Sequence, residues 1–371
     1  MPRKIFFIDS SRSLQLDKIG GTNSIVRRLI EQISETYEVI LLDINGKNSD
    51  LISIDEKVSS KSFPNISNLI LYISKEKPAI IVDIYLHPIQ RLVWGIYRIV
   101  NFKHYFCKIY FSWPDNFLKR ILSFSDSIFF RYNGKVFCIT ERQLNLLRSL
   151  FIKNTILLWP PIPESYYKKE IRSENLDNEK IIISWIGRLD NGKGADLAFD
   201  ILKFFEDDDR FEIKVLAHSL HNDKSIKIPD EFLNNPKYEI NIVSYDSFNE
   251  SLDKNVSDLL KETTIFICPY RLLSSTIDCP MLIQEAAAAN CIIVSKDYPI
   301  IMNILGAGRY LISSNLNDSD IVSSSLKKIS CAIQNITEEQ KRLLNHVESL
   351  EFSSNEVGSR FISSLSKYLK D

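Results

Sequence analysis

Short, continuous apolar segments alternate with segments of helical periodicity along the whole chain, and this alternation restricts the possible folds most strongly. In the first part of the chain the apolar segments are Ile5–Ile8, Val39–Leu42, Ile80–Ile84, Lys108–Phe111, Val136–Ile139 and Ile156–Leu158. In the second part they are Ile181–Ile186, Ile213–Ala217, Ile240–Val243, Ile265–Cys268, Cys291–Val294 and Arg309–Ile312. They lack in-and-out alternation, which is typical of parallel strands buried on both faces.

The segments between these strands have the spacing of amphipathic helices. In residues 195–206 one helical face would carry Leu197, Ala198, Ile201, Leu202 and Phe205. Alternating strands and helices imply right-handed crossovers. The sequence therefore predicts an α/β fold with two Rossmann-like, doubly wound parallel sheets.

A proline-rich segment separates the two halves. Three of the four residues in Pro160–Pro163 are proline, which excludes a helix or a central strand, and a polar stretch follows. We therefore predict an N-terminal domain over 1–160, a linker over 161–180, a C-terminal domain over 181–350 and a final helix over 351–371. Ligands of such sheets bind outside the carboxyl ends of the strands, and two facing domains would form a cleft.

Composition excludes several classes of protein. The longest apolar runs, such as Ile80–Ile84, are far shorter than the roughly 20 residues that span a bilayer. The apolar stretch Ile5–Ile8 is too short for a secretory signal, so a cytoplasmic location is expected. Six scattered cysteines without a C-x-x-C pair predict neither a zinc site nor a disulfide framework.

The charge is distributed unevenly. Residues 1–163 contain 22 Lys and Arg against 14 Asp and Glu, whereas the remainder contains 24 against 33. Residues 91–137 hold eight basic side chains against two acidic ones, mixed with aromatic residues. This mixture fits peripheral contact with an anionic membrane, or core aromatics beneath a basic surface. No nucleic-acid-binding motif accompanies the charge, so no nucleic-acid partner is predicted.

The loop after the first strand of the second half is the most informative segment. Gly187, Gly192 and Gly194 allow close backbone approach, and the loop leads directly into a helix. Arg188 can form a forked contact with phosphate oxygens, and Lys193 adds a charge near the helix start. A helix N-terminus also attracts anions, so the loop suits a diphosphate. The alternative is an ordinary turn between strand and helix, since the P-loop pattern is absent.

Residues 184–194, Ser-Trp-Ile-Gly-Arg-Leu-Asp-Asn-Gly-Lys-Gly, resemble the G-R-L-x-x-x-K-G loop of family 4 glycosyltransferases. The resemblance implies the GT-B architecture, in which two Rossmann-like domains face each other across a cleft. It also implies that Arg188 and Lys193 stabilise the departing donor diphosphate without a metal or other cofactor. Gly20 and Gly21 resemble the family's N-terminal Gly-Gly loop, which approaches donor phosphate and acceptor. The segments 136–162 and 352 onward resemble the family's strand-helix-strand before the linker and its closing helix.

The family's Glu-x7-Glu signature is only partly present. Glu285 matches the second glutamate, which accepts hydrogen bonds from the nucleotide ribose, but Ile277 replaces the first. Asp278 lies next to it and would either contact the transferred sugar or cap the following helix. In either case the segment is expected to bind the donor, with backbone amides offered to phosphate. The donor-binding residues predicted here are Asp278, Cys279, Pro280, Met281, Leu282 and Glu285.

Two further motifs concern the acceptor and metals. His87 follows the strand Ile80–Ile84, where an imidazole would act on a sugar hydroxyl or serve as a structural loop residue. Ser112–Asp115 follows the next strand and is a weaker acceptor candidate. Asp207–Asp209 contains the D-x-D of metal-dependent glycosyltransferases, but it lies in a polar charge run, so no metal is predicted.

The resemblance implies a retaining hexosyltransferase. Such an enzyme would move a sugar from a nucleotide-diphosphate donor to a glycan or lipid-linked glycan, in polysaccharide or glycoconjugate biosynthesis. Two alternatives remain: a nucleotide-sugar epimerase or phosphorylase on the same fold, and a non-catalytic partner subunit, which Ile277 favours.

Overall fold

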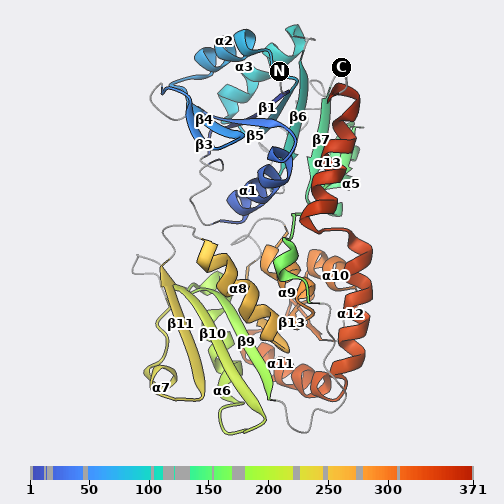
Figure 1. Ribbon diagram of the computed structural model, residues 1–371. Helices are drawn as coiled ribbons and strands as arrows, with labels where there is room; N and C mark the ends of the chain where they lie inside the picture. The colour runs from blue at the N-terminus through green and yellow to red at the C-terminus, as the bar shows by residue number, and fades with distance from the viewer. Residues whose placement is uncertain are drawn as a thin grey trace. The chain divides into compact units, whose positions relative to one another are not determined.

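The computed structural model divides the chain into two compact units (Figure 1). It describes residues 3–11, 14, 20–44, 49–101, 104–111, 121, 134–152, 154–168, 180–219, 226–244, 250–272, 279–306 and 310–369. The first unit comprises residues 1–161 and 352–371, and the second comprises residues 162–351. Among the described residues, no helix combines the length and apolar character needed to cross a membrane.

The first unit is built on an eight-stranded sheet with the order β3-β4-β2-β1-β5-β6-β7-β8. The strands are β1 (Lys4–Asp9), β2 (Glu38–Asp43), β3 (Ile52–Asp55), β4 (Val58–Ser62), β5 (Ile80–Tyr85), β6 (Tyr105–Tyr110), β7 (Gly134–Cys138) and β8 (Thr155–Leu157). The helices are α1 (Gly21–Ser34), α2 (Ile66–Glu76), α3 (Pro88–Val100), α5 (Glu141–Ser149) and α13 (Ser354–Leu369). All neighbouring strands are parallel except β3 and β4, so a doubly wound α/β sheet is confirmed.

Two strands of this sheet were not predicted. β3 is exposed along its whole length, and β4 has the polar sequence Val-Ser-Ser-Lys-Ser. They pair antiparallel at the edge of the sheet. An antiparallel strand can face water on one side, so its sequence does not have to be a continuous apolar run. A third difference is the start of β6 at Tyr105, three residues before the predicted Lys108.

The last helix, α13, packs in the first unit although it follows the whole second unit in sequence (Figure 1). Phe361 of this helix lies 4.8 Å from Phe137 of β7, measured between ring centroids. Gly358 faces α1 so closely that an added Cβ would lie 2.8 Å from Gln32 Cβ. The chain's end is therefore part of the core of the first unit.

The second unit contains a six-stranded, fully parallel sheet with the order β11-β10-β9-β12-β13-β14. Its strands are β9 (Ile181–Arg188), β10 (Phe211–Ser219), β11 (Tyr238–Ser244), β12 (Ile265–Cys268), β13 (Ile292–Lys296) and β14 (Leu311–Ile312). The helices are α6 (Ala195–Lys203), α7 (Asp230–Leu233), α8 (Glu250–Glu262), α9 (Met281–Ala288), α10 (Pro299–Leu305), α11 (Asp318–Ile333) and α12 (Ile336–Leu350). One face of the sheet is buried beneath α6 and α11 in a continuous apolar core.

Candidate active site

The loop between β9 and α6 lies at the carboxyl edge of the second sheet. Arg188 is the last residue of β9, and its Nε lies 3.0 Å from an Asp190 carboxylate oxygen. The other Asp190 oxygen accepts a 2.8 Å hydrogen bond from the Lys193 backbone N–H, which caps a short 3-10 turn. Asp190 thus contacts both the Arg188 side chain and the Lys193 backbone, and these two contacts order the loop.

Gly194 is required by the protein's own backbone. Its φ of 67° lies in the left-handed region, and a Cβ at this position would stand 2.3 Å from the carbonyl oxygen of Pro269. Only glycine fits both conditions. The sequence predicted close approach to a ligand at this residue, and the structure shows close approach to the segment after β12.

Arg271, which follows β12 in the chain, also stabilises this loop. Its guanidinium forms a forked ion pair with Asp196 at 2.6 and 2.7 Å, and contacts Asp318 of α11 at 2.8 Å. It also bonds Asn191 Oδ1 in the loop. The backbone N–H of Arg271 donates to Gly192 O at 3.1 Å. Forked, charge-assisted bonds of this kind fix geometry as well as adding energy.

The Lys193 ammonium is held without a carboxylate partner. Nζ lies 4.4 Å from the centroid of the Tyr270 ring, and among the described residues it makes no hydrogen bond or ion pair. Loss of hydration is the main cause that lowers the Lys193 pKa to about 8, and the Arg188 charge adds to it. An anion placed here would therefore meet a cation that forms no ion pair with a carboxylate of the described residues.

His218 belongs to the site although the sequence did not indicate it. The register of β9 and β10 pairs His218 with Arg188, so both side chains leave the same face of the sheet edge. Burial lowers the His218 pKa to about 4, helped by the charges of Arg188 and Lys193, so the ring is neutral at pH 7. The signal that could have indicated His218 is its position just after the predicted apolar strand Ile213–Ala217, which is the next strand in the chain after the one that ends at Arg188.

Glu285 lies on α9, the helix that follows β12 in the chain. It is 7% exposed, and its charge is close enough to raise the pKa of Tyr270, which also responds to Arg188. Arg188 and Lys193 therefore lie in one loop, and the charges of Arg188 and Glu285 both reach Tyr270 within the second unit; the binding of a donor by these residues stays a prediction.

The start of α9 differs from the interpretation of Asp278 as the cap of this helix. The N-cap is Pro280, so Asp278 precedes the capping position by two residues. Asp278 and Ile277 lie outside the described residues, as does the whole of Ser112–Asp115. Cys279 is buried and its thiol donates to Gln284 Oε1 at 3.2 Å. Pro280 has no N–H, so this residue cannot offer an amide to phosphate as the sequence predicted for the segment.

The predicted residues of the first unit have mainly local contacts. Gly20 is the N-cap of α1, with extended backbone, and the helix begins at Gly21. His87 begins α3, where it forms a capping box with Gln90, and its backbone N–H donates to Ser10 Oγ at 3.0 Å. Its ring is exposed and meets Tyr85 edge-on. His87 therefore has a structural role, and its action on an acceptor stays a prediction.

The basic segment 91–137 is less exposed than its composition indicated. Asp83 accepts a hydrogen bond from Lys108 at 2.9 Å and pairs with Arg98 at 3.4 Å, and all three side chains are buried. Lys135 donates to the backbone oxygen of Ser364. Two of the eight cations thus neutralise a buried carboxylate and cannot reach an anionic partner. Lys103, Lys119, Arg120 and Arg131 lie outside the described residues.

The D-x-D sequence is occupied by local ion pairs. Asp208 binds Arg210 at 2.6 Å, and Asp209 binds Lys237 at 3.1 Å. Asp208 is the middle residue of the D-x-D and Asp209 is its second aspartate, so one of the two motif aspartates pairs with a cation of the chain itself.

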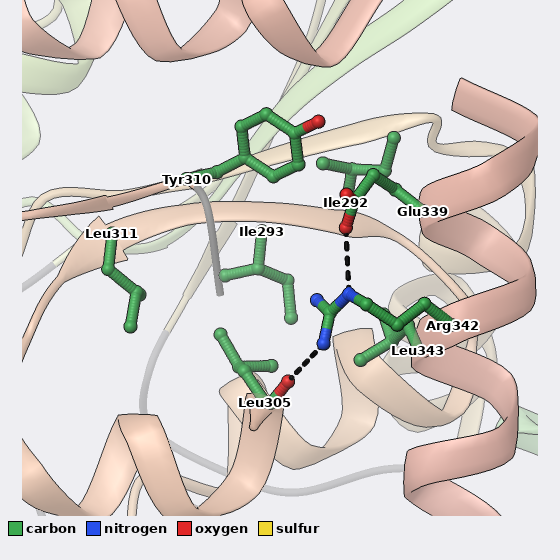
Figure 2. Close-up of a pocket in the computed structure, with 8 residues that line it drawn as sticks. All are labelled: Ile292, Ile293, Leu305, Tyr310, Leu311, Glu339, Arg342 and Leu343. Atoms are coloured by element: carbon green, nitrogen blue, oxygen red, sulfur yellow. Dashed lines mark hydrogen bonds and ion pairs between the residues drawn. The ribbon is translucent and has the colours of Figure 1, made fainter. Parts of the chain in front are cut away.

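Two hollows of the second unit do not suit a diphosphate. One, shown in Figure 2, has a volume of about 20 Å³, which is room for about one water molecule. The other, of about 400 Å³, lies between β10, β11 and α8. It is large enough for a ligand, but Glu239, Asp258 and Glu262 line it, and Lys214 is already shared by three glutamates.

Comparison with solved structures identifies the fold. The chain is similar to sucrose-phosphate synthase from Thermosynechococcus elongatus, with a TM-score of 0.67, 12% identity and 99% of each chain covered. It is also similar to the pneumococcal O-GlcNAc transferase GtfA in complex with UDP and GlcNAc (TM-score 0.66, 9% identity, 100% of each chain). A third is the lipopolysaccharide outer core galactosyltransferase WaaB (TM-score 0.63, 14% identity, 98% and 99%).

These neighbours are GT-B glycosyltransferases, and the match extends over the full chain. The chain therefore has the GT-B fold, with two Rossmann-like domains. No protein-family model matches the sequence, and no match was found among characterised protein sequences.

The pKa of Lys193 predicts how anion binding depends on pH. The affinity for a nucleoside diphosphate should fall as pH rises above about 8, approaching tenfold per pH unit, because binding requires the ammonium form. The stability of the free protein depends on pH in the opposite direction. The folded state binds fewer protons than the unfolded state between pH 8 and 10.5, so this group makes the free energy of unfolding rise with pH. Calorimetric titration at pH 7, 8 and 9 checks the first statement, and Lys193→Ala should remove the dependence.

Proposed function

We propose that this protein is a glycosyltransferase that transfers a sugar from a nucleotide-diphosphate donor to a glycan or lipid-linked acceptor, with retention of configuration. The observation that carries the proposal is the Lys193 ammonium, which lies over the Tyr270 ring in the loop that also holds Arg188 and makes no ion pair with a described residue. The GT-B fold supports it, since two of the neighbours described above are a synthase and a transferase of sugars.

The proposed mechanism assigns one role to each of these residues. Arg188 exchanges Asp190 for a phosphate oxygen, and Lys193 moves onto the same diphosphate. Both cations then stabilise the negative charge that develops on the leaving group, which is the main catalytic effect. Glu285 accepts hydrogen bonds from the ribose hydroxyls. The two cations perform the task that a metal performs elsewhere, so the proposal includes no metal.

A panel of nucleotide sugars tests this function. UDP-, GDP- and ADP-sugars are first screened for thermal stabilisation of the full chain, and the stabilising donor is then incubated with candidate acceptors. We expect nucleoside diphosphate to be released in an acceptor-dependent and phosphate-independent manner. Release that requires phosphate would indicate a phosphorylase, and an isomerised donor would indicate an epimerase. Binding without turnover would favour the non-catalytic subunit, which the replacement of a glutamate by Ile277 also favours.

We also propose that the first unit contacts a membrane through α3. Five apolar side chains on this helix are between 48% and 80% exposed: Ile89, Leu92, Ile96, Ile99 and Val100. The sequence has no Asp or Glu between Asp83 and Asp115, so nothing acidic in this stretch repels anionic lipid. A lipid-linked acceptor would be presented at such a surface.

Vesicle sedimentation tests the contact. Wild-type protein should co-sediment with phosphatidylglycerol vesicles, and Ile89→Ser combined with Ile96→Ser should reduce the bound fraction severalfold without changing the melting temperature, because both side chains are exposed. Leu71→Ser on α2, which is also exposed, is the matched control. Equal sedimentation of all three proteins would contradict the proposal.

A further inference from the structure

The contact between the Lys193 ammonium and the Tyr270 ring is not needed to keep the loop between β9 and α6 folded. Lys193 lies in a loop that Asp190 and Arg271 already order, so its side chain is not needed to hold the loop together. A lysine in such a loop would ordinarily extend into water or pair with a carboxylate. Instead its ammonium lies over an aromatic face, with the ring centroid 4.4 Å away.

Tyr270 is itself fixed in place. It is 1% exposed and lies two residues after the end of β12, with its backbone N–H donating to Cys268 O at 3.0 Å. Its carbonyl oxygen accepts a bond from the Tyr298 hydroxyl at 3.3 Å. Burial is the main cause that raises its pKa well above 10, so the ring stays neutral and keeps its attraction for a cation. The Tyr270 ring is therefore a rigid support beneath a flexible side chain.

An aromatic support differs from a carboxylate in one important respect. A carboxylate would hold Lys193 equally well, but it would cancel the charge, and the bond would have to break before phosphate could bind. An aromatic face attracts the ammonium while leaving its N–H donors and net charge available on the other side. Asp190, a described acidic group whose charge reaches Lys193, is engaged by Arg188 and by the Lys193 backbone N–H.

We propose that Tyr270 is a positioning residue for Lys193: its ring face holds the ammonium at the place where the donor diphosphate binds, and leaves the charge unneutralised for the leaving group. The inference rests on the proposed function and goes beyond it, because it assigns a role to a residue outside every motif of the sequence. Tyr270 acts through Lys193 and does not itself touch the reacting atoms.

The proposal predicts a change in the pH profile. The titratable groups that face Lys193 are Arg188, Asp190, His218, Cys268 and Tyr270. At pH 7 to 9 the His218 ring and the Cys268 thiol are neutral, since burial lowers the first pKa to about 4 and raises the second to about 12. Removing the ring would therefore destabilise the ammonium form, and the alkaline limb of nucleoside diphosphate binding should move to lower pH.

Substitution at position 270 separates positioning from packing. Tyr270→Phe keeps the ring and should bind nucleoside diphosphate within about twofold of wild type, whereas Tyr270→Met fills similar space without a ring and should bind about tenfold more weakly. The probes are UDP, GDP and ADP, measured by calorimetry from pH 7 to 9.5 with the nucleotide that stabilises the full chain. Tyr310→Leu is the matched control, since Tyr310 is a buried tyrosine of the same unit in the pocket of Figure 2. It should lower the melting temperature without moving the alkaline limb.

A fluorinated series guards against a folding defect in the methionine variant. Phenylalanine, 4-fluorophenylalanine and 3,4,5-trifluorophenylalanine at position 270 have nearly the same shape, but each fluorine weakens the attraction of the ring for a cation. The alkaline limb should move to lower pH in that order. An unchanged limb across the series and in Tyr270→Met, while Lys193→Ala has lost affinity, would overturn the positioning role alone. Full affinity in Lys193→Ala would overturn the proposed donor site itself.

Discussion

Replacing Lys193 by alanine should lower turnover about 10²- to 10³-fold and leave the melting temperature unchanged or slightly higher. Turnover falls because the departing diphosphate loses one of the two cations that stabilise it. Stability is kept because the Lys193 ammonium makes no hydrogen bond or ion pair to a described residue, and because its lowered pKa shows that the folded state disfavours its charge. Steady-state kinetics and differential scanning calorimetry on the same preparations measure both effects.

Lys203→Ala provides the matched control for this experiment. Lys203 is the last residue of α6, in the helix that Lys193 precedes, but it is exposed and pairs with Glu231 at 2.7 Å. Surface ion pairs of this kind contribute little, so its removal should leave both turnover and melting temperature nearly unchanged. Unchanged turnover in Lys193→Ala would refute the assignment of Lys193 to the leaving group.

The largest effect on stability is expected from Gly194→Ala. The new Cβ would lie 2.3 Å from the Pro269 carbonyl oxygen, and alanine would also have to adopt a φ of 67°. A backbone atom cannot move aside as a side chain can, so the loop or the segment after β12 must shift. We expect a loss of more than about 3 kcal/mol in the free energy of unfolding, with loss of nucleotide binding.

Urea denaturation of Gly194→Ala and Gly20→Ala tests this expectation. Gly20 has extended backbone, and among the described residues a Cβ there would meet the Asn23 side chain, at 3.0 Å from Oδ1. Because Asn23 can rotate, Gly20→Ala should cost less than about 1 kcal/mol. Equal stability of the two variants would show that the approach of Gly194 to Pro269 does not restrict the loop.

The sequence predicted the sheets well wherever strands are buried on both faces. Ile181–Ile186 and Ile265–Cys268 read as continuous apolar runs because helices cover both sides of the second sheet, and both lie within strands β9 and β12. The antiparallel pair β3 and β4 gave no such signal. It lies at an edge, where β3 is exposed and the mainly polar β4 is mostly half-buried, and β4 is hydrogen-bonded to β2.

The candidate site was predictable only where one motif contains its residues. Arg188 and Lys193 lie in a single loop, and Glu285 follows at a fixed place in the second signature. His218 reaches the site through the register of β10 with β9, and Tyr270 through the bend after β12. Both contacts join residues far apart in the chain, so spacing alone could not indicate them. The buried pair Lys108 and Asp83 shows the same limit, because composition alone gave Lys108 to a basic surface.

The central claim is that Arg188 and Lys193 hold the donor diphosphate, and a crystal structure of the complex with the stabilising nucleoside diphosphate tests it most directly. We predict both phosphates between the Arg188 guanidinium and the Lys193 ammonium, with the ribose hydroxyls on Glu285. A nucleotide bound elsewhere in the chain, with these two side chains directed into solvent, would contradict the account.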